Sequence, residues 1–354
     1  MSLRRFDLEI ASRELVRASR PPPGFPPVLA VSNLDLILGP FPIYLVSVYA
    51  PPPGGVAAVV SAVRAALPAY LSHFFPFAGR VVRDPATNIP EVACNNAGAE
   101  LVVADAAVPL AAVDFAQVDR SIGLMRVAFD ASLPLSLQLV RFACGGFSLT
   151  VATNHLLADG RAFIVLLNAL GEMVREGRLT SEPLLDRSLL MPRSPPRFSP
   201  SLDEEFSRFT PATMINPLMA AAIQRRLYRI EAADLERLRE ERAGPASVEE
   251  VLGAPLHAVA GMVRAAITAA MTRDRFQQLV DWMETKKAAA FKDGGKWTEA
   301  VNLGLGSPAM VISGLLPFAI DGDMGFGKPR LVMPWLQHGR LGLAYPAGAH
   351  GSRL

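Results

Sequence analysis

The chain has 354 residues, of which 51% are hydrophobic and 19% charged, so it has ample material for one large domain or two ordinary ones. A formal net charge of +2 gives no basis for a nucleic-acid partner. Two cysteines, Cys94 and Cys144, form neither a disulfide framework nor a metal-like spacing, which favours a reducing, cytoplasmic compartment.

The N-terminal stretch MSLRRFDLEIASREL has no long apolar segment, so a signal peptide is not expected. No run of residues reaches the ~20 apolar positions of a membrane span. We therefore expect a protein without a membrane partner, and its composition indicates no metal site.

The first half of the chain alternates strand and helix patterns. Residues 41–50 are rich in β-branched and aromatic side chains and predict a strand. Residues 56–75 carry apolar side chains at helical spacing, with Pro68 as an expected kink or end. Further elements are predicted as short strands at 77–84, 89–95 and 99–106, a hairpin at 134–154 turning at Gly145 and Gly146, and a helix at 161–177 with Gly177 as its C-cap.

The second half begins with a proline-rich stretch, roughly 181–217, which is a poor helix and a poor strand. We interpret it as an interdomain crossover. Beyond it we predict a strand at 225–230, a helix at 232–240, a helical block from Ser247 to about Lys287, and a strand region at 308–319. This order predicts an α/β protein of two lobes, with residues 1–180 in the first, 181–224 in the crossover and 225–354 in the second.

One polar corner follows an apolar strand pattern, in the sequence ATNHLLADGRAF at residues 152–163. His155 stands at the expected exit of a strand, and Asp159 stands where the next helix begins. Imidazole exchanges a proton near neutral pH and so suits a general base. The alternative is structural: a histidine beside an apolar strand and an aspartate that caps a helix. The other histidines, His73, His257, His338 and His350, have no comparable context.

The sequence NHLLADG around His155 resembles the H-x-x-x-D-G motif of the BAHD acyltransferases, plant enzymes of secondary metabolism that use coenzyme A thioesters. A second segment, DMGFGKP from Asp323 to Pro329, resembles that family's D-F-G-W-G-K-P motif, with Met324 and Phe326 in place of Phe and Trp. LSHFFPFAGR at 71–80 resembles its Y-P-x-A-G-R segment, and SNLD at 32–35 its early S-x-x-D.

The resemblance implies a two-lobed, chloramphenicol-acetyltransferase-like α/β fold and a monomer. It implies acyl transfer from acyl-coenzyme A, as co-substrate, to a small alcohol or amine, with no permanently bound cofactor. His155 takes the role of general base, and Asp159 pairs with an arginine to hold the loop. Asp323, Gly325 and Gly327 take a structural role away from the chemistry.

The chain also departs from the family pattern. After residue 241 it lacks the strand that carries the arginine partner of the motif aspartate, and its C-terminal end is short, so we expect an incomplete second lobe. Near the expected tunnel it has Ile312, Ser313 and Gly314, and so lacks one supporting hydrogen-bond donor.

Two hypotheses therefore stand beside the enzyme. One is an inactive or impaired family remnant, the product of exon skipping or truncation, that acts at most as a binding protein. The other, a condensation-type enzyme with a carrier-bound acyl group, is disfavoured because those proteins carry a second histidine where this chain has Asn154.

Overall fold

The computed structural model describes residues 8–38, 40–209, 258, 261–262, 264–265, 267–268, 271–292, 296–299, 311–314, 320–336 and 341–344. Predictions that fall outside these ranges, such as the strand at 225–230 and the helix at 232–240, stay predictions. The same holds for the lobe division, because the boundary between the crossover and the second lobe, at residues 224–225, lies outside the described residues.

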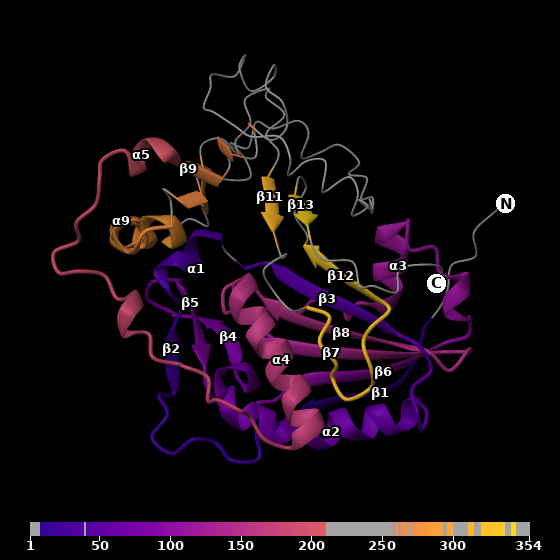
Figure 1. Ribbon diagram of the computed structural model, residues 1–354. Coiled ribbons are helices and arrows are strands. Elements are labelled where there is room, and N and C mark those ends of the chain that lie inside the picture. Colours follow the sequence, from indigo (N-terminus) through magenta and orange to yellow (C-terminus); the bar gives the residue numbers. More distant parts are fainter. Residues whose placement is uncertain are drawn as a thin grey trace.

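A six-stranded sheet dominates the described part of the chain (Figure 1), with strand order β1-β6-β7-β8-β3-β12. Its members are β1 Leu8–Val16, β6 Ala99–Ala106, β7 Leu135–Phe142, β8 Phe147–Asn154, β3 Pro42–Tyr49 and β12 Leu331–Leu336. The β6 and β7 strands are parallel and the other neighbours are antiparallel. The last strand, β12, comes from the C-terminal part of the sequence, so the chain returns to the sheet that its first half builds.

Three smaller sheets accompany the large one. Their strands are β2 Val28–Ala30, β5 Pro90–Ala93 and β4 Arg80–Arg83 in the first, β10 Lys296–Glu299 and β9 Phe206–Phe209 in the second, and β11 Val311–Gly314 and β13 Leu341–Ala344 in the third. The helices are α1 Asn33–Leu38, α2 Val56–His73, α3 Val118–Met125, α4 Gly160–Glu176, α5 Leu202–Glu205 and α9 Arg273–Lys292, with 3-10 turns η1 Phe75–Ala78, η2 Leu110–Ala112 and η3 Ser188–Leu190. The mixed α/β class is confirmed.

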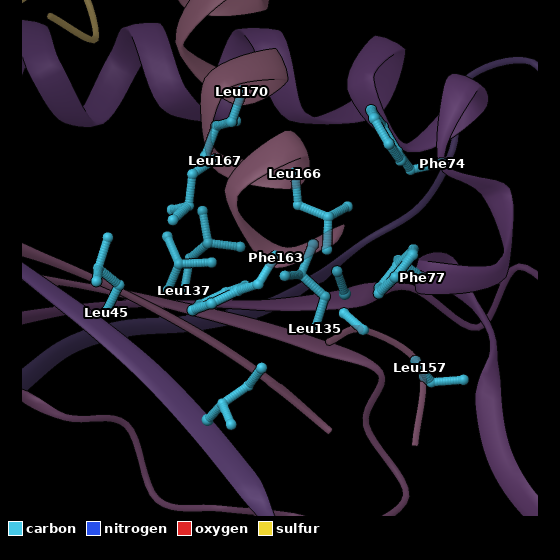
Figure 2. Close-up of a cluster of buried hydrophobic side chains, with 14 of the residues drawn as sticks. Leu45, Phe74, Phe77, Leu135, Leu137, Leu157, Phe163, Leu166, Leu167 and Leu170 are labelled. Carbon is cyan, nitrogen blue, oxygen red and sulfur yellow. The ribbon is translucent and has the colours of Figure 1, made fainter. Parts of the chain in front are cut away.

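The two faces of the large sheet bury two apolar clusters, which is why every residue of β3 and β8 is buried. Helices α2 and α4 cover one face (Figure 1), and α3 with its flanking loops lies against the other. Figure 2 shows how α4 contributes: Phe163, Leu166, Leu167 and Leu170 recur at helical spacing and point toward strand residues that include Leu137.

Helix α2 differs from the sequence prediction at its proline. Pro68 lies inside the helix, which continues to His73, so the helix does not end at the proline, which was one of the two outcomes we expected. A proline leaves the carbonyl four residues earlier without its helical donor, and that residue, Arg64, is exposed, so water can solvate the carbonyl.

By its length and its mean hydropathy of 1.3, α2 is also long and apolar enough to cross a membrane, which the sequence analysis did not expect. Its Val63 and Leu67 are fully buried in the protein core beside α4.

Two other predictions need correction. The crossover is not free of regular structure, because η3, α5 and β9 lie within 181–217, and β9 pairs with the distant β10. The helical block expected to end near Lys287 contains α9, which begins at Arg273 after Thr272 and runs on to Lys292. The Thr272 hydroxyl accepts a hydrogen bond from the Arg275 N–H at 3.2 Å, which caps the helix and interrupts the block.

Candidate active site

The corner around His155 forms where β8 leaves the sheet. The backbone N–H of His155 donates to the Phe41 carbonyl at 2.9 Å, one residue before β3 begins, so the ladder between the two strands extends to the histidine. The His155 ring packs on the Phe41 ring with centroids 4.5 Å apart and planes tilted by 34°. The residue is half-buried, with Nδ1 shielded from solvent. A rigid strand end and an aromatic ring therefore hold the imidazole.

Side chains fix the loop at both of its ends. Asn154 is fully buried, its Oδ1 accepts the Leu156 N–H at 3.1 Å, and its Nδ2 donates to the Ala131 carbonyl at 3.2 Å. At the other end Asp159 is the N-cap of α4, and its Oδ1 accepts the Ala162 N–H at 2.7 Å. These two caps determine where the backbone places His155.

Asp159 is exposed, and among the described residues no arginine lies within ion-pair distance of it. The sequence comparison assigned it an arginine partner, and the segment after residue 241, where that strand is expected, lies outside the described residues. The arginine pairing therefore stays a prediction, while the capping bond is present in the structure.

A second carboxyl group, Asp35 of the SNLD segment, lies in α1 near this corner. Burial raises the pKa of Asp35 to about 7; the positive charge of Arg187 works against this rise, and the negative charge of Asp159 adds to it. The neighbouring Asn33 is buried and donates from Nδ2 to the Val280 carbonyl of α9 at 2.9 Å and to Glu284 at 2.8 Å. The SNLD segment thus connects α9 to the His155 corner.

The second motif forms a separate loop between α4 and β12. Asp323 Oδ1 accepts the N–H groups of Gly325 at 2.7 Å and Gly327 at 3.0 Å, and both glycines have positive φ, 92° and 88°. A Cβ on Gly325 would lie 3.0 Å from the side chain of Arg175. Because Arg175 is fifteen residues along α4 from its start, this loop lies roughly 20 Å along the helix axis from the His155 end.

Sequence reasoning singled out His155 and Asp159 but missed Phe41, Asn154 as a loop cap, and Arg187. The register that brings Phe41 to His155 is a property of strand pairing between distant segments, which no local motif reveals. Asn154 was noted only as the position of a histidine in another family. Its capping role was detectable, because asparagine commonly accepts hydrogen bonds from nearby backbone N–H groups in turns.

An open cavity of about 390 Å³ lies elsewhere, at the edge of the sheet formed by β1 and β6. Its lining residues are Arg13, Glu14, Leu15, Arg80, Glu100, Asp130, Ser132 and Leu133. Arg13 pairs with Glu100 at 3.0 Å, and Arg80 donates to the carbonyls of Gly79 and Gly98. These charges are used within the protein, and His155 is not part of the lining.

The sheet order and the helices around it define a mixed α/β protein. A family model described as the Transferase family matches residues 6–249, more than half of the sequence. The chain therefore belongs to this family, the BAHD acyltransferases.

Curated relatives agree with this assignment. An omega-hydroxypalmitate O-feruloyl transferase of Arabidopsis thaliana is 30% identical over 189 residues, which are 51% of this chain and 40% of that protein. A hydroxycinnamoyltransferase of Narcissus pseudonarcissus is 34% identical over 218 residues, 59% of this chain and 48% of that protein. The chain thus spans about half, or less, of the length of these relatives.

Solved structures show the same fold. Vinorine synthase superposes with a TM-score of 0.61 at 18% identity, over 98% of this chain and 92% of that chain. TRI101 of F. sporotrichioides, complexed with coenzyme A and T-2, superposes with a TM-score of 0.62 at 17% identity, over 89% of this chain and 90% of that chain. These superpositions confirm the expected mixed α/β fold class, while the division into two lobes stays a prediction.

Proposed function

We propose that the protein transfers an acyl group from an acyl-coenzyme A thioester to an alcohol or amine, with His155 as the general base. The observation that carries this proposal is the His155 ring itself, half-buried at a strand end and held by Phe41 and by a loop capped on both sides. Support also comes from relatives named for hydroxycinnamoyl transfer and from a fold shared with a structure that binds coenzyme A.

The chemistry requires one base and no covalent acyl-enzyme. The neutral His155 imidazole takes the proton of the acceptor hydroxyl or amine. At the same time the oxygen or nitrogen of that group attacks the thioester carbonyl carbon. The resulting tetrahedral oxyanion collapses, the carbon–sulfur bond breaks, and the coenzyme A thiolate leaves and is protonated by the imidazolium. A loop that holds the imidazole in place supplies much of the rate because the reacting groups are already aligned.

The substrates follow from the same comparisons. Hydroxycinnamoyl thioesters are proposed as donors, and the relatives' names point to shikimate, omega-hydroxypalmitate, fatty alcohols and 5-hydroxyanthranilate as acceptors to test. We propose a cytoplasmic monomer that holds no permanent cofactor. Within the described residues no group of three or more potential metal ligands occurs.

The test offers purified protein a matrix of acyl-coenzyme A donors and these acceptors, with free thiol and the ester or amide product both measured. His155→Ala is expected to lower kcat by about 10²- to 10⁴-fold, the usual contribution of a general base. His73→Ala is the matched control, since His73 pairs with Glu182 at the end of α2, and full activity is expected. Equal activity of His155→Ala and the wild type would exclude the proposed role.

The alternative is a remnant that binds without turnover. It predicts folded protein whose melting temperature rises with coenzyme A and which releases no thiol with any donor. Thiol release that depends on His155 excludes it.

A further inference from the structure

A loop beside the large sheet holds the end of β8 that leads to His155. The loop, residues 126–134, follows α3 and leads into β7. Its Ala131 carbonyl accepts a hydrogen bond from Asn154 Nδ2 at 3.2 Å, and its last carbonyl accepts one from the Thr153 hydroxyl at 2.7 Å. The two residues that directly precede His155 are therefore both bonded to this loop.

The first residue of the same loop contacts two further strands. The guanidinium Cζ of Arg126 lies 5.1 Å from the centre of the Trp335 ring in β12 and 5.9 Å from the centre of the Tyr44 ring in β3. Both distances are within the range of a cation–π interaction. The two rings meet edge to face at 5.2 Å, and they belong to partner residues of the β3–β12 ladder. We call this three-residue contact the Arg126 clamp.

The surroundings of the clamp favour a strong contact. Tyr44 is 1% exposed and Trp335 is 7% exposed, while Arg126 is half-buried. Among the described residues no ion pair includes Arg126, so no carboxylate draws its guanidinium away from the rings. A cation–π interaction is stronger when its partners are withdrawn from water. The clamp is therefore well placed to hold β12 against β3.

The clamp lies toward the end of β3 that supports the imidazole. Tyr44 is three residues from Phe41, roughly 10 Å along the strand. From Tyr44 the β3–β8 ladder continues without a register shift, and beyond it the His155 N–H donates to the Phe41 carbonyl at 2.9 Å. In the sheet order β12 is the last strand, beside β3 (Figure 1). Because strands at the margin of a sheet open more easily than central ones, contacts that hold β12 also protect this end of β3.

Resting on the proposed function, we propose that Arg126 is a positioning residue for the acyl transfer: its clamp keeps β3 paired with β12 and so keeps His155 in place. Arg126 does not touch the reacting atoms. The two rings of the clamp belong to the apolar cluster on one face of the sheet, whereas Phe41 packs against the cluster on the other face. The clamp therefore acts on the imidazole through the backbones of β3 and β8.

Substitutions at the clamp test this through turnover. Arg126→Ala is expected to lower kcat by between about fivefold and a hundredfold with KM nearly unchanged, since a misplacement of about 1 Å costs about the upper figure. Arg126→Gln keeps the apolar stem without the charge and is expected to lose as much. Trp335→Phe keeps an aromatic face and is expected to stay within about twofold of the wild type, whereas Trp335→Leu is expected to match Arg126→Ala.

A double variant and a matched control complete the series. Arg126→Ala and Trp335→Leu remove the same contact, so the double variant is expected to lose less than about threefold beyond either single variant. The control is Arg120→Ala, an exposed arginine of α3, which is expected to retain wild-type kcat. Losses that multiply in the double variant, or wild-type kcat in Arg126→Gln, would overturn the inference.

A second measurement does not depend on turnover. The His155 amide hydrogen is bonded to the Phe41 carbonyl and exchanges with solvent when this strand end opens, and NMR follows its rate. If that opening breaks the clamp, Arg126→Ala and Trp335→Leu raise the exchange rate of His155 by about three- to thirtyfold, the equivalent of one cation–π contact. Trp335→Phe and Arg120→Ala are expected to leave the rate near that of the wild type.

The slowest amides in the centre of β7 and β8 are the internal reference, since they exchange through global unfolding. A clamp that serves global stability alone raises the exchange rates of these central amides and leaves the rate of His155 unchanged. That pattern would overturn the inference, because the clamp would then stabilise the protein without holding the corner.

The two measurements separate the two proposals. A wild type that releases no thiol with any donor contradicts the proposed function, and the exchange series still decides whether the Arg126 clamp holds the His155 corner. A wild type that turns over, with His155 exchange unchanged in Arg126→Ala, leaves the proposed function standing and removes Arg126 from it.

Discussion

Two regions that border α1 each bury a carboxyl group, and they shift its pKa in opposite directions. At the junction between the crossover and α9, Asp281 is fully buried. Burial by itself raises its pKa, but hydrogen bonds from the Arg193 and Arg197 backbone N–H groups, the Arg193 side chain and Gln277 outweigh burial and lower the pKa to about 2. At the His155 corner, burial raises the pKa of Asp35 to about 7.

The difference lies in hydrogen-bond donors rather than in depth. Among the described residues none donates a hydrogen bond to the Asp35 carboxyl, whereas the donors around Asp281 are on both the backbone and side chains. A buried carboxylate that accepts several hydrogen bonds keeps its negative charge near neutral pH. A buried carboxyl group without such donors changes its ionisation in that range. Asp281 at the junction therefore stays ionised near neutral pH, whereas Asp35 at the corner gains or loses its proton there.

Removing the carboxylate of the junction gives the largest expected effect. Asp281→Ala leaves buried backbone N–H groups without acceptors and Arg193 without its counter-ion, so the free energy of unfolding is expected to fall by about 3–5 kcal/mol. Urea unfolding at pH 7 measures this loss. A decrease below about 1 kcal/mol would show that the crossover does not depend on Asp281.

The same carboxylate predicts an acid dependence. The folded pKa of Asp281 is depressed, so its stabilisation is present above about pH 4 and is lost as the pH falls toward 2. The wild type is expected to lose on the order of 2 kcal/mol over that interval that Asp281→Ala does not lose. Parallel curves for the two proteins would contradict the assignment.

The sequence predicted most of the first-half elements because their signals are local. The strand at 41–50, the hairpin at 134–154 and the helix ending at Gly177 are all present, and Gly177 has the left-handed conformation expected of a C-cap. The N-terminal strand β1 was missed. It is an edge strand with many exposed positions, so its sequence lacks the apolar run that identifies a buried strand.

The candidate site was predictable only in part, because a sequence reveals local signals and not contacts between distant segments. His155 and Asp159 are conspicuous within one short motif, but their surroundings come from segments far apart in the sequence. Phe41, Asp35 and Arg187 reach the corner through sheet pairing, α1 and the crossover respectively. The path of a proline-rich crossover is set by contacts such as Arg193 with Asp281, and composition alone does not reveal those contacts.

A subtler change at the junction has an intermediate effect. Arg193→Ala removes the side-chain bond from Nε to Asp281, 2.6 Å long, but leaves the backbone N–H bond in place. A charge-assisted hydrogen bond contributes about 1.5–3 kcal/mol, and since the Arg193 side chain is 39% exposed we expect the lower end of that range. Arg197→Ala is the control, because Arg197 donates to Asp281 only through its backbone. Equal destabilisation by both variants would mean that the side-chain bond contributes nothing.

The smallest effect is expected at the corner. Asp159→Ala removes the N-cap of α4 and is expected to lower the free energy of unfolding by about 1 kcal/mol, whereas Asp159→Asn and Asp159→Ser keep a capping oxygen and lose only a few tenths. The three variants together separate the cap from the charge. If kcat falls in Asp159→Ala but not in Asp159→Asn, the cap positions His155; if it falls equally in both, the negative charge itself is required. An equal loss of kcat in both variants would mean that Asp159, like Asp281 and unlike Asp35, acts through its negative charge. The cation that pairs with it would then lie outside α1 and the crossover.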